Sequence, residues 1–199
     1  MTEPTTKPAE KARWHWMDSY RGLAVLLVAF GHPAGVTTHV DLELNIPGMD
    51  EFWAFFRPVR MPLMFFLSGT LLERSLRKGM RTYAEGKIRR VLWPYLVWSI
   101  ILLVACADPT WWLDPEVWTR GPVHMWFLRT LLVVYLVAPP MLWISPWVLV
   151  IASVALTTIV APAPDDRLIG LAIFWPGMVF LGAAMAPHFK RIQNLGWWL

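Results

Sequence analysis

The sequence contains few charged residues. Only 16% of its 199 residues are Asp, Glu, Lys or Arg, whereas 56% are hydrophobic and the mean hydropathy is +0.45. Soluble domains carry about 25% charged and about 45–50% apolar residues. The shortage of charge therefore excludes an ordinary soluble domain. The net charge is +4, but the basic residues lie between hydrophobic runs and do not form a polar face, which argues against nucleic-acid binding.

Several catalytic and structural signatures are absent from the sequence as well. Cys106 is the only cysteine, so an intramolecular disulfide cannot form. Candidate metal ligands do not cluster at a useful spacing, no glycine-rich phosphate loop occurs, and no G-x-S-x-G motif marks a hydrolase nucleophile. We therefore expect no metal and no permanently bound cofactor. No cleavable signal peptide is visible, because the first apolar run follows a polar arm and lacks a small-residue cleavage site.

Long apolar runs make up most of the chain. A helix needs about 20 residues to cross about 30 Å of hydrocarbon. The 14 Trp residues stand mostly near the ends of such runs, where indole rings favour the membrane boundary. The pattern predicts an all-α, polytopic transmembrane helical bundle of about six spans and the start of a seventh. A flexible N-terminal arm is expected at 1–16, followed by spans at 17–36, 51–72, 91–107, 122–137, 146–161 and 168–186.

Positive charge predicts the orientation of these spans. Residues 73–90 contain seven Lys and Arg residues, whereas residues 37–50 contain none. Cytoplasmic loops of membrane proteins are enriched in Lys and Arg, so residues 73–90 are expected in the cytoplasm. With alternating spans the N-terminus is cytoplasmic too. We expect a multi-pass protein of the inner (plasma) membrane.

Ionisable residues inside the first apolar run are candidate functional groups, because charge is costly in hydrocarbon. Arg21 and His32 are eleven residues apart, about three helical turns and a further 20°, so they share one face about 16 Å apart along the axis. Asp18, three residues before Arg21, can pair with it. Pro33 predicts that the helix kinks or ends beside His32. The imidazole then either faces a cavity and serves in catalysis, or only hydrogen-bonds a neighbouring helix.

Further charged residues follow in the later runs. Arg74 and Arg77 stand at i and i+3 and can hold a phosphate or carboxylate through forked hydrogen bonds, or are simply two cytoplasmic charges. Arg60 either reaches an inner aqueous cavity or snorkels to the outer interface. Arg129 stands near the middle of its span and is expected to face the bundle interior, whereas His124 stands at the outer boundary, where it can be a satisfied interface residue. The candidate cavity residues are Asp18, Arg60, Ser68, His124 and Arg129.

These residues also carry a resemblance to a known family. MDSYRGLAVLLVAFGH resembles the opening helix of the membrane acyltransferase 3 family, in which Arg or Lys is followed by ten residues and His, here Arg21 and His32. RMPLMFFLSGTLLERSLR resembles its second-helix segment with an R-x-x-R motif, here Arg74 and Arg77. KIRRVLWPYLVWSII, HMWFLRTLLVVYLVAPPML and FWPGMVFLGAAMAP resemble later segments, in family order over about residues 17–190.

The resemblance implies an enzyme that transfers an acyl group, typically acetyl from cytoplasmic acetyl-CoA, to a hydroxyl of a carbohydrate or related acceptor. In such an enzyme His32 is the catalytic base, Arg21 supports it, and Arg74 and Arg77 contribute on the CoA side. The expected partners are membrane lipid, acyl-CoA as donor substrate, and the hydroxyl acceptor. The family domain has more spans than residues 17–199 supply, so we expect its N-terminal part, with low or no activity alone. A transporter or channel-like protein, and an inactive truncated acyltransferase remnant, are the alternatives.

Overall fold

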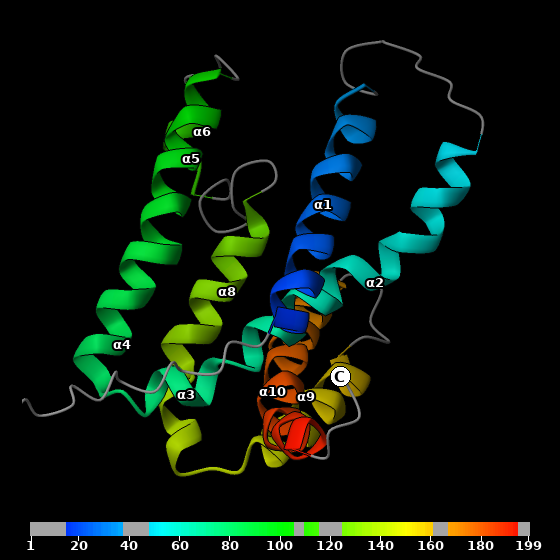
Figure 1. Cartoon of the computed structure of the whole chain (residues 1–199). Coiled ribbons are helices and arrows are strands. Elements are labelled where there is room, and N and C mark those ends of the chain that lie inside the picture. Colours follow the sequence, from blue (N-terminus) through cyan, green and yellow to red (C-terminus); the bar gives the residue numbers. More distant parts are fainter. Residues whose placement is uncertain (1–14, 38–47, 106–109, 116–124, 161–166, 195–199) are drawn as a thin grey trace, which may run out of the picture. The chain divides into compact units, whose positions relative to one another are not determined.

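The computed structural model describes residues 15–37, 48–105, 110–115, 125–160 and 167–194, and every regular element within them is helical (Figure 1). The predicted all-α class is therefore confirmed for this part of the chain. The chain forms two compact units, Met1–Arg60 and Met61–Leu199. The elements are α1 (His15–Thr37), α2 (Met49–Gly69), α3 (Leu72–Leu76), α4 (Met80–Lys87), the π-helix η1 (Ile88–Leu92), α5 (Trp93–Ala105), α6 (Thr110–Leu113), α8 (Trp126–Val137), the 3-10 helix η2 (Pro139–Leu142), α9 (Pro146–Val160) and α10 (Arg167–Asn194).

Helices occupy the expected spans with three differences. First, α1 continues through Pro33 to Thr37, so of the two alternatives expected at Pro33 the end of the helix is wrong, and the kink stays a prediction. Second, the basic segment 73–90 is mostly helical, because α3, α4 and η1 all lie within or across it. Third, α10 runs to Asn194, beyond the expected end of the last span, and contains two internal prolines. Of the predicted N-terminal arm, only its last two residues are described, and they belong to α1.

One continuous helix of the described chain is long and apolar enough to cross a membrane, judged by length and composition. It is Met80–Ala105, which combines α4, η1 and α5. Its 26 residues extend about 39 Å, more than the roughly 30 Å of hydrocarbon, so its basic first part can lie outside the apolar layer. Three apolar helices are shorter: Trp126–Val137, Pro146–Ile159 and Ile173–Phe189. The other expected spans stay predictions.

The buried side of this long helix repeats every four residues. In an α-helix a step of four residues passes a full turn by about 40°, so five such steps would rotate the buried side by about 200°. The π-helical η1 in the middle forms i→i+5 hydrogen bonds and takes up an extra residue, which reverses part of that rotation. The helix therefore keeps one buried side along its length. Its residues, buried except for the half-buried lysine, are Tyr83, Lys87, Val91, Tyr95, Ser99 and Leu103.

An aromatic cluster lies in the core of the second unit. The ring of Phe65, whose side chain is fully buried, lies 4.8 Å from that of Phe127, 5.2 Å from that of Trp175 and 6.3 Å from that of Trp126, measured between centroids. The two tryptophan rings are 5.6 Å apart. These residues belong to α2, α8 and α10, in the Met-Pro-Leu-Met-Phe-Phe, Trp-Phe-Leu and Phe-Trp-Pro-Gly segments. Three of the segments that carry the family resemblance therefore meet in one packed cluster.

The end of α2 and the middle of α10 approach each other backbone to backbone. A Cβ atom added to Gly69 would overlap the carbonyl of Val179, and one added to Gly182 would overlap the carbonyl of Phe66. Glycine permits this approach because it has no side chain, as is common where membrane helices associate. The contact fixes the end of α2, from which the R-x-x-R segment follows.

Candidate functional site

The first unit holds the N-terminal candidates on α1. The Nη1 atom of Arg21 lies 3.8 Å from the Oδ1 atom of Asp18, three residues earlier, so the ion pair expected from the spacing is present. The side chains are 32% and 44% exposed, and such a pair contributes little to stability. His32 lies on the same helix, but its side chain lies outside the described residues.

The R-x-x-R pair stands on a short helix whose other side is buried. Leu72 and Leu76 of α3 are 0% and 2% exposed and belong to the core of the second unit. Arg74 lies between them in sequence, so it points to the opposite, outer side of the helix, and Arg77 forms its C-terminal cap. Both arginines are exposed. The buried leucines therefore hold the two guanidinium groups where a donor in solution can reach them.

The two arginines are not equivalent, because one of them already has a carboxylate partner. The Nε and Nη2 atoms of Arg77 both donate to Oε1 of Glu73, at 2.9 and 2.8 Å. Within the described residues Arg74 forms no ion pair. Sequence reasoning missed Glu73, although its i, i+4 spacing to Arg77 is a recognisable signal. Arg74 is thus available to a ligand, whereas Arg77 must leave Glu73 or share it.

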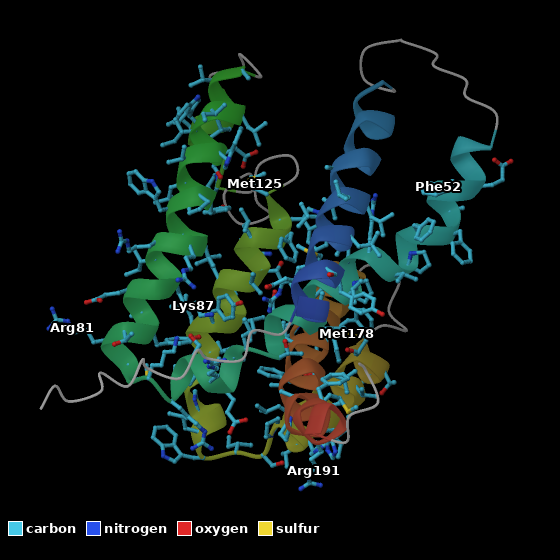
Figure 2. The ribbon with its side chains drawn as sticks, in the orientation of Figure 1. Phe52, Arg81, Lys87, Met125, Met178 and Arg191 are labelled. Atoms are coloured by element: carbon cyan, nitrogen blue, oxygen red, sulfur yellow. The ribbon has the colours of Figure 1, made fainter. Side chains whose placement is uncertain are left out.

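Exposed basic side chains continue beyond α3. Lys78, Arg81, Arg89 and Arg90 are all exposed, and Figure 2 shows Arg81 projecting away from its helix. The Nε atom of Arg81 donates to Oε1 of Glu85 at 3.0 Å. In residues 73–90, seven cations against two carboxylates leave an excess of five positive charges. Such an excess attracts a polyanion such as a phosphorylated ligand.

Lys87 is the member of this segment that faces inward, between α4 and α8 (Figure 2). Its Nζ atom lies 3.5 Å from the ring centroid of Tyr135 and 5.3 Å from that of Tyr83. The Tyr83 hydroxyl donates to the backbone carbonyl of Tyr135 at 2.8 Å. The cation therefore packs on aromatic rings and joins two helices. The sequence analysis missed this contact, because it treated Lys87 only as one of seven basic residues that indicate membrane orientation.

The remaining described candidates lie in α2 and α8. The hydroxyl of Ser68 donates to the carbonyl of Met64 at 2.8 Å, so it is bonded within its own helix. Arg60 is half-buried in α2. Arg129 is half-buried in α8. His124 lies outside the described residues.

The model of the acyltransferase 3 family, described as an acyltransferase domain, matches residues 14–199. The chain belongs to the acyltransferase 3 family. The acyltransferase domain includes every candidate residue from Asp18 to Arg129 and extends over both units. The membership supports a membrane acyltransferase-type function and agrees with the long apolar helix Met80–Ala105. No curated protein and no solved structure matches the chain.

Proposed function

We propose that this protein is an integral membrane enzyme that moves an acetyl group from acetyl-CoA to a hydroxyl of a carbohydrate or related acceptor. The family membership supports acyl transfer in general. One observation supports CoA as the acyl donor. Arg74 is exposed, Arg77 beside it is bonded to Glu73, and both belong to a helical segment with a large excess of positive charge. Guanidinium groups match the oxygens of phosphate, and CoA carries phosphate groups. Arg74 and Arg77 are the proposed CoA-binding residues.

His32 is the proposed catalytic base. Its imidazole removes the proton from the acceptor hydroxyl, and the hydroxyl oxygen attacks the carbonyl carbon of the thioester. The carbon–sulfur bond breaks, and the CoA thiolate takes the proton from the imidazolium, so the histidine is regenerated. Imidazole suits this task because it gains and loses a proton near neutral pH. Arg21, paired with Asp18 on the same helix, lies on the face that leads to His32.

The proposed topology follows the distribution of Lys and Arg. Residues 73–90 and the N-terminus lie in the cytoplasm, where acetyl-CoA is made and used, and the protein crosses the inner (plasma) membrane several times. The charge excess of residues 73–90 and the length of the helix Met80–Ala105 support this arrangement. A cysteine placed at exposed Lys78 should react only with a membrane-permeant maleimide in intact cells if the segment is cytoplasmic.

The experiment that tests the enzyme measures donor binding and acetyl transfer separately. Membranes containing the chain are incubated with tritiated CoA, and then with acetyl-CoA radiolabelled on the acetyl group. Arg74→Ala should weaken CoA binding about ten-fold, the value of one good charge-assisted contact. His32→Ala should leave CoA binding unchanged and abolish transfer. Arg81→Ala is the matched control, because Arg81 is exposed and bonded to Glu85, and it should bind CoA within about two-fold of wild type.

Three results would contradict the proposal or favour an alternative function. Equal transfer of label by wild type and His32→Ala would remove His32 from the chemistry. Binding of CoA without transfer in wild type would favour the inactive remnant. Flux of a charged solute through vesicles without CoA binding would favour a transporter.

A further inference from the structure

Arg89 and Arg90 lie where the long helix Met80–Ala105 changes from basic to apolar. They are its last charged residues, because residues 91–105 contain no Asp, Glu, Lys or Arg. Both side chains are exposed, and within the described residues neither forms an ion pair. The two carboxylates of the basic segment are both bonded to other arginines. The two charges at the start of the apolar part therefore lack an acidic side chain that balances them.

The same two arginines belong to the π-helix η1. The backbone N–H of Trp93 donates to the carbonyl of Ile88, which is an i→i+5 hydrogen bond. In an α-helix neighbouring side chains diverge by about 100°. A π-helix has more residues per turn, so its neighbouring side chains diverge by less, and such turns are frequent at functional sites. Two long guanidinium side chains from adjacent positions can then bind the oxygens of one phosphate group.

An exposed apolar surface begins one turn after Arg89. A position two residues from a buried one lies on about the opposite side of a helix. Val91 is buried, so Arg89 and Trp93, two residues before and after it, lie on the outer side. The Trp93 side chain is 65% exposed. The outer side therefore passes from a guanidinium to an indole and then to exposed aliphatic side chains, which are Leu96, Ile100, Ile101 and Val104.

This order of chemical groups matches the parts of a phospholipid. Its phosphate is anionic, its glycerol region lies at the boundary of water and hydrocarbon, and its acyl chains are apolar. Indole rings favour that boundary, and arginines at a membrane surface attract anionic lipid. We propose that the outer side of the long helix binds an anionic phospholipid. Its phosphate binds Arg89 and Arg90, its glycerol region lies beside Trp93, and an acyl chain follows the aliphatic side chains.

A lipid fits this surface better than a soluble phosphate ligand does. A soluble ligand would leave the exposed indole and aliphatic groups uncovered, whereas a lipid covers the basic and the apolar part together. From Arg89 to Ile101 the helix extends about 18 Å, a little more than half of the roughly 30 Å of hydrocarbon, so a lipid of the adjacent leaflet covers this length. The proposal depends on the helix crossing a membrane. It does not depend on acyl transfer, because its residues take no part in the proposed reaction.

The test measures binding of lipid to the full chain purified in non-ionic detergent. Phosphatidylglycerol, or phosphatidylcholine with the same acyl chains, is titrated in, and native mass spectrometry gives the dissociation constant of the first bound lipid. Wild type should bind phosphatidylglycerol more tightly. Arg89→Gln and Arg90→Gln should each weaken this binding about five-fold. Arg81→Gln is the matched control, because Arg81 is exposed on the same helix but bonded to Glu85, and it should stay within about two-fold of wild type.

Two further measurements separate a lipid site from diffuse charge and from a soluble phosphate site. Trp93→Ser keeps every charge and should also weaken phosphatidylglycerol binding, whereas excess CoA should leave that binding unchanged. Equal affinity of wild type for the two lipids would overturn the proposal, as would an equal loss in Arg81→Gln and Arg89→Gln. Unchanged binding in Trp93→Ser, or displacement of the lipid by CoA, would do so too. Circular dichroism and the melting temperature check that each variant is folded, and the substituted side chains are exposed.

Discussion

Replacing Glu73 with glutamine tests the proposed donor site directly. In the wild type both Nε and Nη2 of Arg77 donate to one oxygen of Glu73. The substitution removes the negative charge but keeps the size of the side chain, so Arg77 becomes free to bind phosphate. Since the pair is exposed and lies at i, i+4, its loss should change the free energy of unfolding by less than about 1 kcal/mol. The effect should appear in CoA affinity instead.

Coulomb's law gives the size of that effect. A phosphate dianion on the far side of the Arg77 guanidinium would lie roughly 7 Å from the Glu73 carboxylate. At that distance in water, repulsion between the two is about 1.2 kcal/mol, and screening at physiological salt lowers it to about 0.5 kcal/mol. Removing the repulsion should tighten CoA binding about two-fold. Release of Arg77 from its partner adds to this change.

The matched control is Glu85→Gln. It removes the same charge from the same segment and releases Arg81, whose Nε atom donates to Glu85. Equilibrium binding of tritiated CoA to wild type and both variants, at low and high salt, provides the comparison. Glu73→Gln should bind more tightly than Glu85→Gln at either salt concentration. If the two variants bind equally, the segment acts only as diffuse charge, and Arg77 has no special place in donor binding.

Substitutions at Gly69, Gly79 and Lys87 test the packing, with the free energy of unfolding measured in mixed micelles. Gly69→Ala would place a Cβ atom against a carbonyl of α10 and should lower the stability of the folded protein by about 1–3 kcal/mol. Gly86→Ala is the control: a Cβ atom there meets nothing within 4 Å, so stability should be unchanged or higher. Gly79→Ala should cost about 1–3 kcal/mol, because Gly79 has φ +94° and ψ 148°, which other residues rarely adopt. Lys87→Met should lower stability by about 0.5–2 kcal/mol, because it removes the cation–π contact with Tyr135. Lys87→Arg should keep most of this stabilisation.

The helices themselves could be predicted from the sequence because their signal is local. Apolar runs of the right length anticipated α1, α2, α5 and α9 closely, and the start of α10. The span expected at 17–36 already included Pro33, and α1 continues through this residue because proline removes only one hydrogen bond and the rest of the helix can absorb that loss. The helical form of the basic segment also escaped prediction, because many charges indicated a loop. Leu72 and Leu76, four residues apart, were the signal for α3.

The candidate site was predictable where it depends on spacing along one helix. The Asp18–Arg21 pair follows from three residues of separation and is present. Contacts between helices could not be predicted, because they depend on which elements pack together. The contact of Lys87 with Tyr135 is of this kind. A four-residue repeat from Tyr83 to Leu103 was visible in the sequence and would have indicated the buried side of the long helix.

In the second unit, the residues that pack the helices together are different from the residue proposed to bind CoA, Arg74. The aromatic residues of the family segments pack against one another around Phe65, and glycines bring α2 and α10 into backbone contact. This packing fixes the end of α2, and the buried leucines of α3 fix the next helix, so Arg74 extends from a rigid support. Phosphate binding needs such rigidity, because a guanidinium that is already positioned loses less freedom when it binds. A packing change at Gly69 should therefore weaken CoA binding as well as stability, although Gly69 contacts no ligand. If Gly69→Ala lowers stability but leaves the affinity for CoA untouched, the arginines bind from a support that does not depend on this helix contact.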